Sequence, residues 1–109
     1  MATTYKVLGQ SNPSATTATT LYTCPASTQT VISTITVTNQ AGTSGTYRIA
    51  VRPNGATLAT EQYIVYDATI SANSVTAYTL GITIDASDVV TVYASSGDFS
   101  FNAFGSEIA

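Results

Sequence analysis

Residues 30–39 read TVISTITVTN, a run in which apolar side chains alternate with hydroxyl-bearing ones. A period of two is typical of a β-strand with one buried and one outer face. The predicted outer face holds Ile32, Thr34, Thr36 and Thr38. The predicted core face holds Val31, Ser33, Ile35 and Val37.

The same period recurs along the chain between short turn signals. RPNG at 52–55 is a turn sequence, because Pro restricts φ and Asn-Gly tolerates positive φ. We interpret 75–84 as one strand with a bulge at Gly81. Together these runs predict an all-β fold: a single antiparallel β-sandwich, Ig-like or jelly-roll-like, of about eight short strands. The strand-like runs cover 4–9, 19–25, 30–39, 46–52, 62–70, 75–84, 89–95 and 99–108.

The length of 109 residues predicts one domain. We expect residues 1–18 to form an N-terminal strand or arm and a linker, which lets that strand reach a neighbour, and residues 19–109 to form the sandwich. Apolar runs are broken too often for a membrane span, and the start lacks the features of a signal peptide. We therefore expect a protein that is made in a cytoplasm and does not contact a membrane.

Charge is scarce: the chain has three cationic and six acidic residues and a net charge of −3. Nucleic-acid binding needs a basic patch, so no nucleic-acid partner is expected. Hydroxyls replace charges, with 21 Thr and 12 Ser. Threonine suits exposed strands, and an uncharged hydroxyl surface is also less costly to bury against a partner. Both interpretations stay open.

Side chains that carry out chemistry are few. The chain has no His, so the commonest general base is missing and we expect no enzyme and no cofactor. Cys24 is alone, which predicts a buried structural thiol rather than a disulfide or a nucleophile. Asp85 and Asp88 share one turn; a Ca²⁺ site is one interpretation, but turn capping is the favoured one and no metal is expected.

The last strand is apolar on both faces. Alternation places Phe99 and Phe101 in the core and Phe104 and Ile108 on the other side, unless a slip at Gly105 returns Ile108 to the core. A terminus is normally polar unless something covers it. Phe104 and Ile108 are therefore candidates for a face between subunits.

Two other segments are candidates for intermolecular contact. Tyr5 and Val7 lie on the first strand, which we expect to pair with, or pack on, a neighbouring subunit, as does the last strand. Arg48 and Arg52 share one outward face, where few internal partners are expected. They either keep a strand edge soluble or bind carboxylates of another subunit.

Seven tyrosines and no tryptophan supply the aromatic surface. Most are expected in the core or at interfaces. An exposed loop pair, Tyr63 and Tyr66, would instead suit stacking on a glycan.

The order and spacing of several segments resemble a small β-domain that recurs in virions of tailed bacteriophages, including phages of cyanobacteria. The likeness runs from about Thr20 to the end, and Cys24 departs from it where an aliphatic residue is expected before Pro25. The segments are TLYTCP at 20–25, Val31 to Asn39, YRIAVRP at 47–53, Tyr63 to Asp67, LGI at 80–82, DVVTVYAS at 88–95 and SFNAFGSEI at 100–108.

This resemblance implies a virion structural protein without enzymatic activity. It implies a capsid cement or decoration protein that forms a homo-oligomer, with a trimer favoured, and binds the major capsid protein or another virion protein. The alternative is a tail, baseplate or fibre-associated subunit that binds glycans or the host surface. Either would be assembled in the host cytoplasm.

Overall fold

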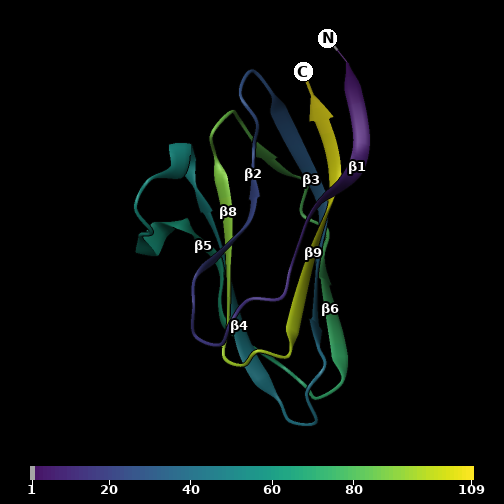
Figure 1. Ribbon diagram of the computed structural model, residues 1–109, viewed down its shortest axis with the longest axis vertical. Coiled ribbons are helices and arrows are strands. Elements are labelled where there is room, and N and C mark those ends of the chain that lie inside the picture. Colours follow the sequence, from purple (N-terminus) through teal and green to yellow (C-terminus); the bar gives the residue numbers. More distant parts are fainter. Residues whose placement is uncertain (1) are drawn as a thin grey trace.

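The computed structural model describes residues 2–109, which form two antiparallel β-sheets packed as a sandwich (Figure 1). The all-β sandwich is therefore confirmed, with nine strands rather than eight. No helix in residues 2–109 is long and apolar enough to cross a membrane. The five-stranded sheet contains β1 (Thr3–Ser11), β9 (Phe99–Ile108), β3 (Gln29–Asn39), β6 (Ser74–Tyr78) and β7 (Ile82–Ile84); the four-stranded sheet contains β2 (Thr19–Thr23), β8 (Val89–Ala94), β4 (Gly45–Arg52) and β5 (Tyr63–Ile70).

The strands pair in a nested order. β1 pairs with β9, β2 with β8, β3 with β6 and β7, and β4 with β5. This wrapping of the first half of the chain against the second is the order of a jelly roll. It also joins the ends of the described chain, since Ala2 and Ala109 exchange two backbone hydrogen bonds of 2.7 and 2.9 Å.

The core lies between the sheets and is richest around Tyr47. The ring of Tyr47 is 6.3 Å from those of Tyr78, Phe99 and Phe101, and its hydroxyl hydrogen-bonds that of Tyr78. Tyr47, Phe99 and Phe101 are fully buried, and Cys24 is also buried, as predicted. Burial raises the pKa of Tyr47 above its usual range, with the Tyr78 hydrogen bond as a second cause.

The predicted faces of 30–39 are wrong in their first half. Ile32 is fully buried and Val31 is not, whereas Ile35 and Val37 are buried as expected. The reason is a β-bulge at Ser33: Ile32 pairs with Gly105 and Thr34 with Phe104, so Ser33 has no partner. The extra residue moves the core face from even to odd positions.

The predicted strand 75–84 is also wrong, because it divides into β6 and β7. The interruption contains Gly81, whose φ is +66°. Both pieces still pair with β3. The turn at 52–55 is confirmed, with positive φ at Asn54 and Gly55.

One loop packs against part of the outer face of the four-stranded sheet. It contains the short 3-10 helices η1 (Pro53–Gly55) and η2 (Thr60–Gln62), which contact β8 and β4 respectively and lie to the left in Figure 1. Ala50 and Thr91 pair on these two strands and are both buried. Alternation places Ala50 on the outer side of β4, so its burial follows from this loop.

The segment that we expected as an N-terminal strand or arm is a strand in the sheet of its own chain. β1 pairs with β9 from Thr3 to Ser11, with a bulge at Leu8. The linker that follows β1 is also hydrogen-bonded to the sandwich. The Asn12 amide donates to the Gly97 carbonyl at 2.9 Å, and the Thr16 N–H donates to the Ala94 carbonyl at 2.8 Å. β1 therefore forms one edge of the five-stranded sheet (Figure 1).

Candidate interaction surfaces

Three apolar side chains gather on the outer face of the five-stranded sheet, and we name them the β1–β9 strip: Tyr5, Val7 and Phe104. Their exposed fractions are 84%, 49% and 37%. Val7 and Phe104 are cross-strand partners, and Tyr5 is opposite Ser106, one pair further along the same face. Phe104 thus points away from the core, as its strand position predicts. The strip unites three of the six predicted interface residues.

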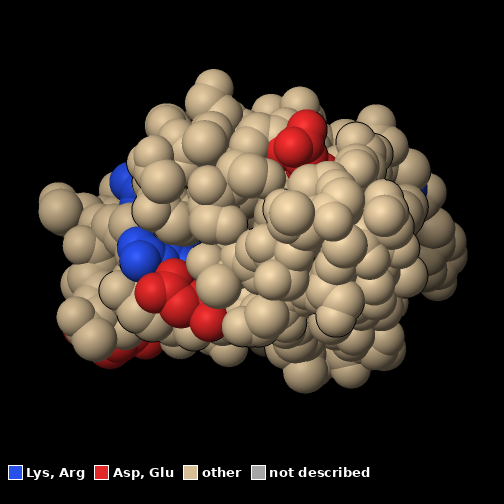
Figure 2. Space-filling model, turned by 90° about the horizontal axis from the view of Figure 1, so that it is seen from below, with Lys and Arg blue, Asp and Glu red and all other residues tan. Residues whose placement is uncertain are grey.

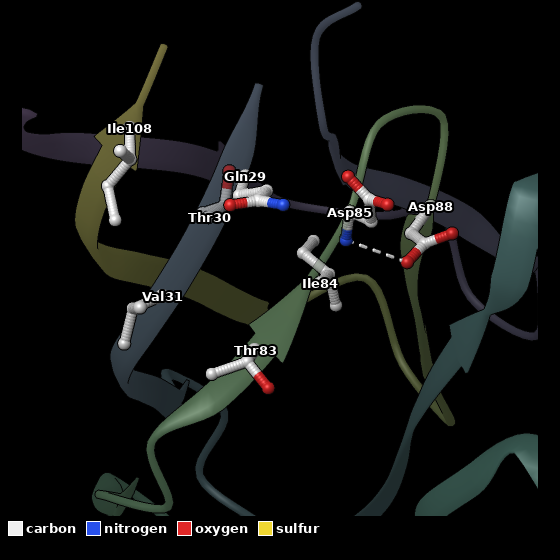
Figure 3. A pocket seen from close by; sticks show the side chains of 8 residues that line it. All are labelled: Gln29, Thr30, Val31, Thr83, Ile84, Asp85, Asp88 and Ile108. Carbon is white, nitrogen blue, oxygen red and sulfur yellow. Dashed lines mark hydrogen bonds between the residues drawn. The ribbon is translucent and has the colours of Figure 1, made fainter. Parts of the chain in front are cut away.

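Ile108 lies on the same face of β9 but is half-buried. Ile108 lines a shallow hollow together with residues of β3, β7 and the turn 85–88 (Figure 3). The alternative, a slip at Gly105, does not occur: the two bulges lie opposite β9, at Leu8 of β1 and Ser33 of β3. The register of β9 itself is continuous, so Ile108 stays on the outer side.

Asp85 and Asp88 line the far side of this hollow (Figure 3). Asp88 accepts backbone N–H bonds from Asp85 at 2.9 Å and from Asn54 at 2.8 Å, while Asp85 accepts one from Ala86 at 2.8 Å. Both carboxylates therefore cap turns, which supports the favoured interpretation of this pair. Among residues 2–109, no three Cys, Asp or Glu side chains gather as a metal site.

The Arg48 side chain has its hydrogen-bond and stacking partners within its own chain. Its guanidinium donates to both carboxylate oxygens of Asp67, at 2.6 and 3.2 Å, and lies 4.3 and 4.2 Å from the ring centres of Tyr66 and Tyr93. The hydrogen bond from Arg48 is the main reason that the pKa of Asp67 is lowered. Asp67 reaches this position from a bulge in β5 with a φ of 51°. The expectation of few internal partners is wrong for Arg48.

Arg52 organises the turn that follows it. It donates to the carbonyls of Gly55 at 3.0 Å and Ala56 at 2.8 Å, and to the Thr91 hydroxyl at 3.4 Å. Its donors therefore have partners within the chain as well. An intermolecular role of the two arginines stays a prediction.

Tyr63 and Tyr66 border a hollow of about 530 Å³ beside η2. Their ring centres are 4.9 Å apart in an edge-to-face arrangement, and 59% of Tyr66 is exposed. The rings are neighbours, but both residues lie on β5 rather than in a loop, and Tyr63 is half-buried, so the predicted exposed loop pair is wrong. The Arg48 guanidinium stacks on Tyr66, so one face of that ring is occupied.

A polar network that the sequence did not indicate lies at the end of the sandwich nearest the termini. The Tyr22 hydroxyl donates to Glu107 at 2.5 Å and lies 2.8 Å from the Thr30 hydroxyl. Lys6 forms an ion pair with Glu107 at 3.3 Å. The hydrogen bond from Tyr22, followed by the contact with Lys6, lowers the pKa of Glu107, and burial is the main cause that raises the pKa of Tyr22.

We expect Glu107→Gln to lower the free energy of unfolding by roughly 1 kcal/mol near pH 7, because the amide keeps only part of a charged hydrogen bond. The folded-state pKa of Glu107 lies below its ordinary value. The stability that it contributes is complete above the unfolded pKa of about 4.3 and is lost as pH falls through the folded pKa. Urea unfolding of both proteins near pH 7 and near pH 3 measures the difference. A gap of equal size at both pH values would contradict this role.

Most of the surface carries no charge. Figure 2 shows one face on which uncharged residues predominate and basic and acidic side chains adjoin at one place. Two ion pairs, Lys6–Glu107 and Arg48–Asp67, use four of the nine charged residues. Residues 2–109 hold no buried side-chain nitrogen or oxygen without a hydrogen-bond partner. The buried polar side chains of this part of the chain are thus satisfied internally.

No protein-family model, curated protein or solved structure matches this chain. The likeness to phage virion domains consequently rests on the order and spacing of the residues alone.

Proposed function

We propose that this chain is a non-enzymatic structural protein of a tailed-phage virion, a capsid cement or decoration protein that self-associates and binds the shell. The observation that carries the proposal is the β1–β9 strip. Contiguous exposed apolar side chains on a soluble domain typically mark a contact with another protein. Here the strip lies on the outer face of the five-stranded sheet, on its edge strand β1 and the adjoining strand β9.

Two further features support the proposal. The surface is rich in hydroxyls and poor in unpaired charge, so it can be covered by neighbours with a small desolvation penalty. The jelly-roll order of strands is common among capsid proteins, although it also occurs in lectins, and the fold alone assigns no function. Together with the resemblance of the sequence, these features favour a virion component over an enzyme.

Mass spectrometry of purified virions and a reconstruction of the particle test this proposal. We expect the chain in the particle, with density for its sandwich on the outside of the head and the β1–β9 strip covered. Adding an epitope tag to the exposed loop at Gly42, where an added Cβ would meet no atom within 4 Å, gives an independent label for the same position. Absence of the chain from purified particles would overturn the proposal.

A second candidate function has its own observation, the hollow beside Tyr63 and Tyr66. A tail, baseplate or fibre-associated subunit would use these rings to bind a host glycan. This candidate predicts label on the tail rather than the head, and glycan-array binding that is lost in Tyr66→Ala. Label on the head with an empty array would exclude it.

A further inference from the structure

We propose that two copies of this chain pair through the free edge of β1, antiparallel about a twofold axis at Tyr5, so that their five-stranded sheets join into one. The inference deepens the proposed function and rests on its self-association. The last strand, which was the other candidate for pairing, is excluded because β9 is hydrogen-bonded on both sides, by β1 and β3.

The backbone of β1 shows which groups are free. Ala2 and Ala109 exchange two hydrogen bonds, so Ala2 directs both its N–H and its C=O toward β9. The register is regular from Thr3 to Val7, and hydrogen-bonded pairs alternate along antiparallel strands. Thr3, Tyr5 and Val7 therefore direct their N–H and C=O groups away from β9, toward the open edge.

The first half of this edge, before the bulge at Leu8, has the regular register. Gly9 pairs with the buried Ala103, so an added Cβ on Gly9 would point into the sandwich, where it would lie 2.2 Å from the Leu21 carbonyl oxygen. Beyond the bulge, β2 therefore packs against the inner face of β1. Residues 3–7 are all exposed. Sheet edges are normally protected by bulges or charges, and the outer strands of the other sheet, β2 and β5, do contain bulges. β6, at the other edge of the same sheet, also has a regular register. Its outer face, however, presents Val75 where β1 and β9 present the three-residue strip.

The proposed register agrees with the side chains. Tyr5 pairs with Tyr5 of the second copy, and Thr3 pairs with Val7 on either side, each pair exchanging two hydrogen bonds. The two β1–β9 strips then form one apolar surface across the axis. Lys6, the only charge on this segment, is opposite Thr4 rather than another Lys6. Its ammonium is also paired with Glu107, so it does not protect the edge.

Light scattering coupled to size exclusion tests the pairing. We expect twice the chain mass of 11.3 kDa, and a twofold drop in mass for Tyr5→Lys, which sets two like charges directly opposite each other. Val75→Lys is the matched control at the other edge of the same sheet and should stay dimeric. Circular dichroism confirms that both variants are folded, as expected at positions that are 84% and 63% exposed.

Oxidation of Tyr5→Cys gives a second readout. The two sulfurs meet at the axis, so a covalent dimer is expected, whereas Val75→Cys should stay monomeric on a non-reducing gel; Cys24 is buried and does not compete. Unchanged mass for Tyr5→Lys, or cross-linking only at position 75, would overturn the pairing. A trimer would overturn the twofold pairing and keep the self-association of the proposed function. A monomer at the highest soluble concentration would overturn both, whereas location in the virion is tested separately.

Discussion

Replacing Gly105 by alanine is expected to lower the free energy of unfolding by roughly 4 kcal/mol, which few single substitutions reach. A Cβ at this position would lie 2.0 Å from the carbonyl oxygen of Val31 and 3.0 Å from the Cα of Ile32. Both are backbone atoms of the central strand β3, so no side chain can move to make room. This close approach of β3 and β9 lies next to the bulge at Ser33. The Ser33 hydroxyl donates a hydrogen bond to the Phe104 carbonyl at 3.1 Å.

Urea or thermal unfolding measures this loss. The matched control is Gly42→Ala, because a Cβ at Gly42 meets no atom within 4 Å. Surface substitutions of that kind usually change stability by less than about 0.5 kcal/mol. Equal stabilities of the two variants would show that β3 and β9 do not approach each other as closely as described here.

Replacing Asn39 by leucine is expected to lower the free energy of unfolding by roughly 3 kcal/mol, because buried groups that lose their partners each contribute about 1–3 kcal/mol. Asn39 is fully buried at the end of β3. Its amide nitrogen lies 2.9 Å from the carbonyl oxygen of Thr43, 3.4 Å from that of Ile70 and 3.3 Å from that of Ser71; its own oxygen accepts the Ala41 N–H at 2.9 Å. Leucine has a similar volume but satisfies none of these groups.

The control for this substitution is Asn102→Leu. Asn102 is only half-buried, and its side chain accepts one hydrogen bond, from Gln10 at 2.8 Å near the surface. We expect it to change stability by less than about 1 kcal/mol. If Asn39→Leu is as stable as this control, the amide does not hold the loop after β3, which contains Ala41 and Thr43, to the end of β5 at Ile70 and Ser71.

The interaction surfaces were only partly predictable. Outward positions of Tyr5, Val7 and Phe104 follow from alternation on strands that contact each other in the fold. The partners of Arg48 do not, because Asp67 reaches it through a bulge and Tyr93 lies on a strand far along the chain. The Tyr22–Glu107 contact is similar: it joins residues 85 positions apart, and no local pattern indicates it.

The sequence by itself determined the class of fold, the approximate number of strands, the turn at 52–55 and the two-sided character of the last strand. These properties are local, because the period of two and the φ preferences of Pro, Asn and Gly act within a few residues. Tertiary structure alone decided the nested pairing, the bulges at Leu8 and Ser33, and therefore which residues of β3 are buried. It also left β1 with an open edge and β9 with none. Register and edge exposure arise from contacts between distant strands, where a single extra residue reverses the faces that alternation predicts.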